Sequence, residues 1–327
     1  MAAALAATPS EGGEAAEAGE LYTFSPKPAF KTELTLEDLS YNLTTIRGKY
    51  VNPTFNVAEV ENLIDTFDSR PDDVFICTYP KCGTTWTQQI VHLLTHDGEQ
   101  GDTNIYDTAP WLETIYAAPI LHEREAGNVT LEQLEERPSP RFFKSHADVP
   151  SLPCGGKPTK VITISRNPKD TCVSMYKHAG EKPEFGMKGE FSDFVKLFLS
   201  GQCECGSFFD FTNEWYAESL RNPENVLWMT YEEMVADPSG SICKIAKFIG
   251  IGDLEPDSEL IQKTVEKSSV ASMKASSGVY AGNVRQGGIG NWRKHFSEED
   301  SALFDLEYQK QMEGVGLTYD FGDSLVM

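Results

Sequence analysis

Residues 73–96 have the pattern of a buried strand, a tight turn and a helix, and this unit constrains the fold more than any other segment. The run DVFICT (73–78) is short, apolar and bounded by turn residues, as in strands that are buried on both faces. The run TTWTQQIVHLLTH (84–96) follows after one turn and has the pattern of a helix. Because strand, turn and helix are the first half of a βαβ unit, the sequence predicts a parallel sheet.

The alternation of strands and helices continues along the chain. Further strands are predicted at 141–146, 160–166 and 225–231. Helices are predicted after an Asn56 cap, after the turn that ends at Asp170, after a Ser192 cap, and over 208–220 and 239–249.

We therefore predict an α/β fold in which residues 21–327 form a single domain. Its central parallel sheet of four or five strands is flanked by helices, and its ligand binds at the carboxyl ends of the strands. Residues 1–20 are rich in Ala, Glu and Gly and are expected to form a disordered acidic segment.

The net charge argues against a protein that binds nucleic acid. The chain has 28 basic and 50 acidic residues, a net charge of −22, whereas a phosphate backbone requires a basic surface. Residues 1–40 hold seven acids and two bases, and residues 297–327 hold eight acids and one base. These two ends account for 12 of the 22 excess negative charges, so the middle of the chain remains compatible with a small anionic ligand.

The sequence favours a cytoplasmic enzyme without a metal site. No run of about 18 apolar residues predicts a transmembrane helix, and residues 1–20 lack the basic and apolar regions of a secretory signal. The seven cysteines are not arranged with the Cys and His spacing of a zinc site, so we expect reduced thiols.

The strongest local motif is YPKCGTTW (79–86), between the predicted strand and helix. Backbone N–H groups at a helix N-terminus bind anions, Gly83 permits close approach of the backbone, and Lys81 adds a full charge. The alternative is an ordinary strand–turn–helix capped by threonine. The motif is not a Walker A loop, because Lys81 precedes the only glycine, and this counts against a nucleoside-type kinase.

The motif resembles the 5′-phosphosulfate loop of cytosolic sulfotransferases, usually written YPKSGTTW. Three further segments resemble motifs of that family and occur in its order: FFKSH (142–146), ISRNPKDTCVSMYKH (164–178) and VRQGGIGNW (284–292). The resemblance covers roughly residues 34–320. It implies a P-loop-kinase-like strand–loop–helix and a donor, 3′-phosphoadenosine 5′-phosphosulfate (PAPS), which leaves as PAP.

The resemblance also implies the catalytic residues. His146 would be the general base that takes the proton of an acceptor hydroxyl, which suits an imidazole. Lys81 and Lys144 would neutralise charge on the transferring sulfuryl group. A purely structural role for His146 is the alternative, and the neighbouring Lys144 counts against it.

The donor site implied by the resemblance involves the anion loop and three later segments. Arg166, Ser174 and Arg285 would bind the 3′-phosphate, with a surface ion pair to Asp170 as the alternative for Arg166. The full set implied to bind the donor is Lys81, Cys82, Gly83, Thr84, Thr85, Trp86, Arg166, Ser174, Tyr231, Ser268, Arg285, Gln286 and Gly287. Trp86 would stack on the adenine.

Several residues depart from the family pattern. Cys82 replaces a serine and is expected to bind phosphate more weakly. Gln286 replaces a lysine in the 3′-phosphate site, and Val270 replaces an aromatic residue beside the adenine. The family's dimer motif is poorly matched at 293–302, so we expect a monomer or a weak dimer.

The acceptor is a small molecule whose identity the sequence leaves open, with O-sulfation or N-sulfation both possible. Trp111, Phe143, Tyr176 and His178 are candidates for the wall of its pocket, and each is also compatible with a place in the core. The alternative function is a PAPS- or PAP-binding relative with little or no activity.

Overall fold

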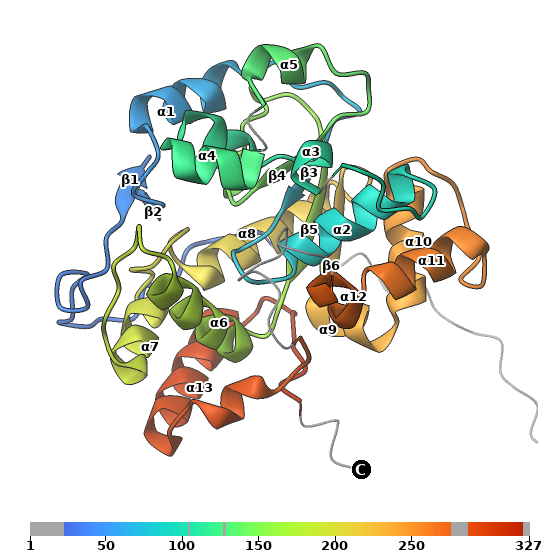
Figure 1. Ribbon diagram of the computed structural model, residues 1–327. Helices are drawn as coiled ribbons and strands as arrows, with labels where there is room; N and C mark the ends of the chain where they lie inside the picture. The colour runs from blue at the N-terminus through green and yellow to red at the C-terminus, as the bar shows by residue number, and fades with distance from the viewer. Residues whose placement is uncertain (1–22, 104, 127–128, 276–286, 323–327) are drawn as a thin grey trace, which may run out of the picture.

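The computed structural model describes residues 23–103, 105–126, 129–275 and 287–322. Its centre is a four-stranded parallel sheet in the order β4-β3-β5-β6 (Figure 1). The strands are β3 (Val74–Cys77), β4 (Phe142–Ser145), β5 (Lys160–Ser165) and β6 (Val226–Thr230). The prediction of an α/β fold with a parallel sheet of four or five strands is therefore confirmed.

Side chains of the strands alternate between two hydrophobic clusters, one on each face of the sheet. Val74 and Ile76 belong to one cluster, and Phe75 and Cys77 belong to the other. The first cluster is completed by helices α2 (Thr84–Thr95), α10 (Pro238–Phe248) and α11 (Glu259–Lys267). The second is completed mainly by α6 (Pro168–Glu181), α7 (Phe191–Leu199), α8 (Phe208–Arg221) and α13 (Glu298–Met312).

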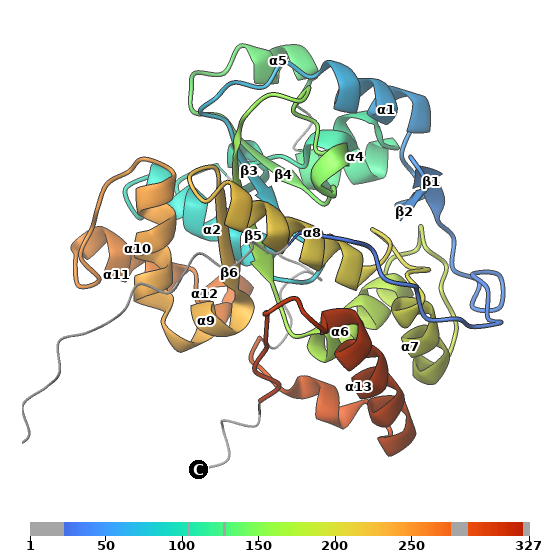
Figure 2. The same ribbon diagram turned by 180° about the vertical axis from the view of Figure 1, so that it is seen from behind.

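A third group of elements lies beyond β4, as both views show (Figures 1 and 2). It contains the helices α1 (Val57–Thr66), α4 (Pro119–Ala126) and α5 (Leu131–Glu135), together with the antiparallel hairpin of β1 (Thr44–Ile46) and β2 (Lys49–Val51). The remaining helical segments are α3 (Ile105–Thr108), η1 (Leu112–Tyr116), η2 (Val149–Ser151), α9 (Tyr231–Ala236), α12 (Val270–Ala275) and η3 (Asn291–Lys294). The hairpin and these short segments were not predicted.

Helix caps confirm one prediction and correct another. The Asn56 side chain caps α1 by accepting from the backbone N–H of Glu59. Ser192, by contrast, is not a cap, because α7 begins one residue earlier, at Phe191. Its hydroxyl instead donates to Asp300 Oδ2 at 2.7 Å, which joins α7 to α13.

Candidate active site

A cavity of about 790 Å³ lies at the carboxyl ends of the strands, where the sequence predicted the ligand site. The loop after β3, His146 after β4, Arg166 after β5 and Tyr231 after β6 all line it. Tyr231 begins α9 and does not end β6, because Thr230 and Glu233 form a capping box at that point. The sheet thus gathers at one edge residues that are far apart in sequence.

The anion loop has the backbone of a phosphate cradle. Lys81 and Gly83 have positive φ values of 69° and 111°, and α2 begins directly after Gly83 without a side-chain cap. A Cβ at Gly83 would lie 3.3 Å from Tyr231 Cδ2, so glycine is needed for both space and conformation. Lys81, Thr84 and Thr85 line the cavity beside the N-terminus of α2, where N–H groups and the helix dipole favour an anion.

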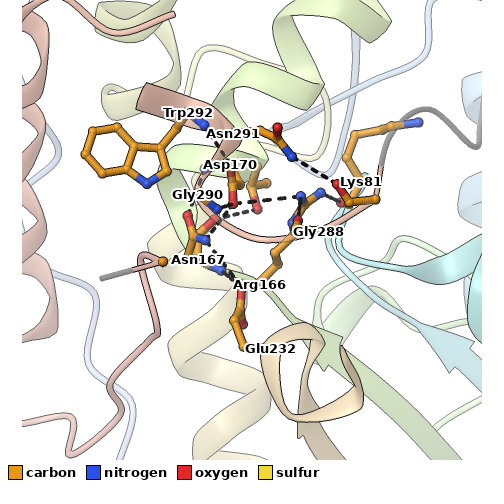
Figure 3. A network of polar contacts seen from close by, with 12 residues as sticks. Lys81, Arg166, Asn167, Asp170, Glu232, Gly288, Gly290, Asn291 and Trp292 are labelled. Carbon is orange, nitrogen blue, oxygen red and sulfur yellow. Dashed lines mark hydrogen bonds and ion pairs between the residues drawn. The ribbon is translucent and has the colours of Figure 1, made fainter. Parts of the chain in front are cut away.

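Arg166 joins the anion loop to the C-terminal glycine loop (Figure 3). Its Nη1 donates to the carbonyl of Lys81 at 3.4 Å and its Nη2 to that of Gly288 at 3.1 Å. Its Nη2 also forms a long ion pair with Asp170 Oδ2 at 3.9 Å, but this pair is buried and not on the surface, because the two side chains are only 12% and 1% exposed. The Arg166 Nε is buried without a hydrogen-bond partner among the described residues, and the residue lines the cavity.

Asp170 holds the glycine loop in place, a role that the sequence did not indicate (Figure 3). Its two carboxylate oxygens accept from the backbone N–H groups of Gly290 and Trp292, each at 2.8 Å. The amide of Asn167 also donates to it. The first turn of α6 therefore fixes residues 287–292 beside Arg166.

Trp86, Tyr231 and the start of α12 form the side of the cavity where the resemblance implies the adenine. The two rings meet edge to face with centroids 5.5 Å apart, and Trp86 Nε1 is buried without a partner among the described residues. Ser174, Ser268, Ser269, Val270 and Gly287 line the same cavity. Arg285 and Gln286 lie outside the described residues.

The three residues expected to act on the sulfuryl group all line this cavity: Lys81, Lys144 and His146. Lys144 is buried, its Nζ forms an ion pair with Glu125 Oε2 at 2.7 Å, and it lies 4.2 Å from the centre of the Trp111 ring. His146 meets Trp111 edge to face at 4.8 Å. The alternation along β4 thus brings Lys144 and His146 to one face.

Hydrogen bonding fixes the tautomer of His146. Its Nδ1 lies 2.7 Å from the backbone carbonyl of Thr78, which can only accept, so Nδ1 carries the proton. Burial, and then the positive charge of Lys144, lower the pKa of His146 to about 3. The imidazole is therefore neutral at physiological pH and has a lone pair on Nε2.

Comparison with known proteins identifies the family. Residues 71–316 match the model of the sulfotransferase domain. Mouse sulfotransferase 2B1 is 33% identical over 82% of this chain and 78% of its own length. Rabbit amine sulfotransferase is 31% identical over 85% of this chain and 93% of its own length.

The chain belongs to the sulfotransferase family. Among solved structures, a mouse sulfotransferase, SULT7A1, in complex with PAP has a TM-score of 0.68 at 26% identity, covering 83% of this chain and 94% of that one. Retinol dehydratase has the same fold, with a TM-score of 0.72 at 24% identity over 87% of this chain and 95% of that one. The protein is thus a PAPS-dependent sulfotransferase, and the prediction of this enzyme class is confirmed.

One residue implied to bind the donor has a different environment in this sulfotransferase. Cys82 is fully buried in the hydrophobic core, and its Sγ lies 3.6 Å from Thr171 Oγ1. Burial raises the pKa of the thiol to about 12. The side chain does not line the cavity, and the weaker phosphate binding expected where Cys82 replaces a serine stays a prediction.

Two of the four residues predicted for the wall of the acceptor pocket line the cavity. Trp111 and His178 line the cavity of the sulfotransferase. Phe143 does not, because it is fully buried between Phe67 and Phe75 in the core. Tyr176 also does not line it: its ring packs on Phe191 and Phe194, and its hydroxyl donates to the carbonyl of Gly189.

Two buried acidic residues of the cavity could not be predicted from the sequence. Glu125 lies in α4, and its ion pair with Lys144 carries no local sequence signal. Glu204 lies in the loop between α7 and α8 and is 3% exposed, and burial raises its pKa to about 7. The only sequence signal for Glu204 is an acid between two cysteines, Cys203 and Cys205.

The structure describes residues 23–103, 105–126, 129–275 and 287–322. Within them, no group of three or more His, Cys, Asp or Glu side chains is arranged to hold a metal ion. In the same residues, no helix has the length and apolar character needed to span a membrane.

Proposed function

We propose that this sulfotransferase moves the sulfuryl group of PAPS onto a hydroxyl of a small-molecule acceptor by in-line attack, with His146 as the general base. The hydrogen bond from His146 Nδ1–H to the Thr78 carbonyl carries the proposal. It holds the ring in one orientation and leaves the Nε2 lone pair in the cavity, as a base requires. The acceptor oxygen then gives its proton to Nε2 as it forms its bond to sulfur.

Lys81 and Lys144 supply the electrostatic part of this mechanism. Both line the cavity beside His146, where their charges lower its pKa before the donor binds. An anionic donor compensates these charges, which moves the pKa of His146 upward, toward the range of an effective base. The lysines stabilise charge that develops on the sulfuryl oxygens and on the departing PAP.

Beyond the anion loop, the donor has two further parts to be bound, its 3′-phosphate and its adenine. We infer that Arg166, Ser174, Gly287 and, from outside the described residues, Arg285 bind the 3′-phosphate. The unpartnered Arg166 Nε supports this role, because a buried guanidinium donor is stabilised by an anionic acceptor. Trp86 and Tyr231 contact the adenine, and Val270 lies where an aromatic residue would complete a stack.

A small organic acceptor is supported by what related proteins bind. Crystals of retinol dehydratase hold PAP together with retinol or androsterone. The cavity of this chain combines Trp111 with charged side chains, which suits an apolar ring that carries polar groups. We also propose that the enzyme acts in the cytoplasm and that the transfer needs no metal ion.

The proposal is tested by replacing His146 and measuring transfer to an aliphatic alcohol, which, unlike an acidic phenol, requires a base. The variant His146→Ala should lose about 10²- to 10⁴-fold in kcat and keep its affinity for PAP, because the imidazole acts on the acceptor. Lys81→Ala should lose both rate and PAP affinity.

The matched control is His122→Ala, because His122 Nδ1 also lies near a backbone carbonyl, 3.1 Å from that of Ile115, but the residue does not line the cavity. Wild-type turnover in His146→Ala would refute the mechanism. Tight PAP binding without transfer to any acceptor would instead favour a binding protein with little activity. A parallel assay with ATP and Mg²⁺ tests the kinase alternative.

A further inference from the structure

The acceptor end of the active site continues into a second hollow. Trp111, His146, Asn52 and Glu204 line both the main cavity and a smaller one of about 60 Å³. The smaller cavity lies under the β1–β2 hairpin and α1, and its apolar wall consists of Ile46, Val51, Phe55, Val60 and Ile64. An acceptor that fills this hollow and reaches His146 therefore also contacts Glu204.

Three other carboxylates around the two cavities each have one oxygen in an ion pair or beside a hydroxyl, although Glu113 Oε2 and the Asp148 oxygens have no hydrogen-bond partner among the described residues. These pairs are Glu125 with Lys144, Asp148 with Lys49, and Glu113 with the hydroxyl of Ser145. Each pairing offsets the cost of removing a carboxylate from water.

Glu204 differs from these residues because its ion-pair partner is the imidazole of His178, which is charged only when it is protonated. Glu204 is 3% exposed, and its Oε2 is buried without a hydrogen-bond partner among the described residues. The imidazole of His178 is near, with Nε2 at 3.4 Å from that oxygen, but the two do not form a hydrogen bond. A buried carboxylate with one orphan oxygen, facing a ligand cavity, is matched by a cationic group of the ligand.

We propose that Glu204 determines acceptor specificity by binding the ammonium group of a substrate that presents a hydroxyl to His146. This inference rests on the proposed function and names the substrate class: an amine that carries a phenolic or alcoholic hydroxyl on an apolar ring. The ring fills the apolar hollow, and the ammonium pairs with the carboxylate. The net charge of −22 attracts cationic ligands to the protein.

The chemistry of the pair also fixes the site of sulfation. An ammonium bound to Glu204 has no lone pair, so it cannot attack sulfur. The hydroxyl oxygen forms the new S–O bond, its proton passes to His146 Nε2, and the S–O bond to the 5′-phosphate of the donor breaks to release PAP. The product is an O-sulfate that keeps its free amine.

The test compares three matched acceptors with the full-length enzyme and PAPS: 4-(2-aminoethyl)phenol, its uncharged N-acetyl derivative and 4-ethylphenol. The amine should exceed both uncharged probes by about tenfold or more in kcat/KM, as expected for one added charge–charge contact. Glu204→Gln should remove this preference, so that the amine is used no better than the two uncharged probes. Glu224→Gln is the control, because Glu224 is exposed and its replacement removes the same charge outside both cavities.

Calorimetric titration of the amine into the protein with PAP separates this inference from the proposed function. Binding of the amine that is lost in Glu204→Gln, with no transfer to any acceptor, would support the role of Glu204 and refute the proposed function. Transfer with equal or better use of the uncharged probes would overturn the inference alone. The inference about Glu204 would also be overturned if the amine did not bind, or if the product were a sulfamate, which forms by sulfation of the nitrogen. Because the wild-type comparison with the N-acetyl probe needs no variant, the inference remains falsifiable if Glu204→Gln does not fold.

Discussion

At the scale of single residues, the carbonyl of Thr78 decides which nitrogen of His146 is available as a base. A carbonyl accepts and never donates, so the hydrogen bond at 2.7 Å assigns the proton to Nδ1. The pKa of His146 depends on burial and on the charges around the ring. In the protein alone, burial and Lys144 lower that pKa to about 3.

The protonation of His146 can be followed directly by nitrogen NMR, with His146→Gln used to assign its signals. Without nucleotide, we expect His146 to stay neutral, with its proton on Nδ1, at pH 5.5, because its pKa of about 3 lies well below that value. Addition of PAP should move the midpoint upward, since the phosphates compensate the lysine charges. A midpoint near 6.5 in the free protein would contradict the geometry described for this residue.

Glu125 neutralises one of the charges that the donor needs. We expect Glu125→Gln to bind PAP about tenfold more tightly, because the variant keeps a hydrogen-bond acceptor for Lys144 and removes a negative charge from an anion site. Isothermal titration calorimetry measures the change. Glu123→Gln is the control, as Glu123 is exposed on the same helix. Weaker binding in Glu125→Gln would mean that the pair instead holds Lys144 in its working position.

At the scale of elements, each strand delivers one functional side chain to the cavity, and the N-terminus of α6 fixes the glycine loop. Parallel strands end at one edge of the sheet, so Lys144, Arg166 and Tyr231 converge although long segments separate them in sequence. The glycine loop has no regular structure at 287–290 and depends on Asp170 for its position.

Removal of the Asp170 carboxylate should release that loop. Asp170→Ala leaves the N–H groups of Gly290 and Trp292 without their acceptors, which is expected to cost about 2 to 4 kcal/mol of unfolding free energy. PAP affinity should fall by more than tenfold, since Arg166 loses its neighbouring loop. Denaturant unfolding and calorimetry measure the two effects. Asp170→Asn retains one acceptor oxygen, so its stability and its PAP affinity should lie between those of wild type and Asp170→Ala. Unchanged PAP affinity in Asp170→Ala would show that the loop is positioned by other contacts.

At the scale of the whole molecule, several buried carboxyls make stability depend on pH. Burial raises the pKa of Glu113, Glu204 and Glu232 to about 7, above the value of about 4.5 in the unfolded chain. The folded state therefore binds more protons than the unfolded state between these values, and stability falls as pH rises through 7. His146, whose pKa is lowered, opposes this trend only below about pH 6.5.

The melting temperature should therefore rise between pH 8 and pH 6.5, with a gain of about 2 kcal/mol from the three carboxyls. Differential scanning calorimetry tests this expectation. Glu232→Gln keeps an acceptor for the backbone N–H of Asn167 and should reduce the gain by about a third. The same pH dependence in wild type and Glu232→Gln would mean that the overall negative charge, and not this carboxyl, is responsible.

Oligomeric state also belongs to this scale and stays a prediction. Ser297 caps α13 and Ala302 is exposed on that helix, in the segment that matches the family's dimer motif poorly. A monomer, or a dimer through another surface, is what we expect from light scattering.

Much of the fold and of the donor site followed from the sequence alone. Strands buried on both faces are continuous apolar runs, and 73–78, 160–166 and 225–231 showed this pattern, so the sheet was predictable. The anion loop was equally visible, because phosphate binding by backbone requires glycine and a helix start at fixed spacing, here Gly83 and α2. These patterns depend only on residues that are close in the sequence, so they can be recognised without the tertiary structure.

Only the tertiary structure decided where side chains point and which charges meet. Phe143 and Cys82 have residue types suited to a pocket or an anion loop, but packing places both in the core. The pairs of Glu125 with Lys144 and of Glu204 with His178 arise from segments that are far apart in the sequence and meet only in the folded chain. Burial sets their electrostatics, and burial depends on contacts that sequence spacing does not encode.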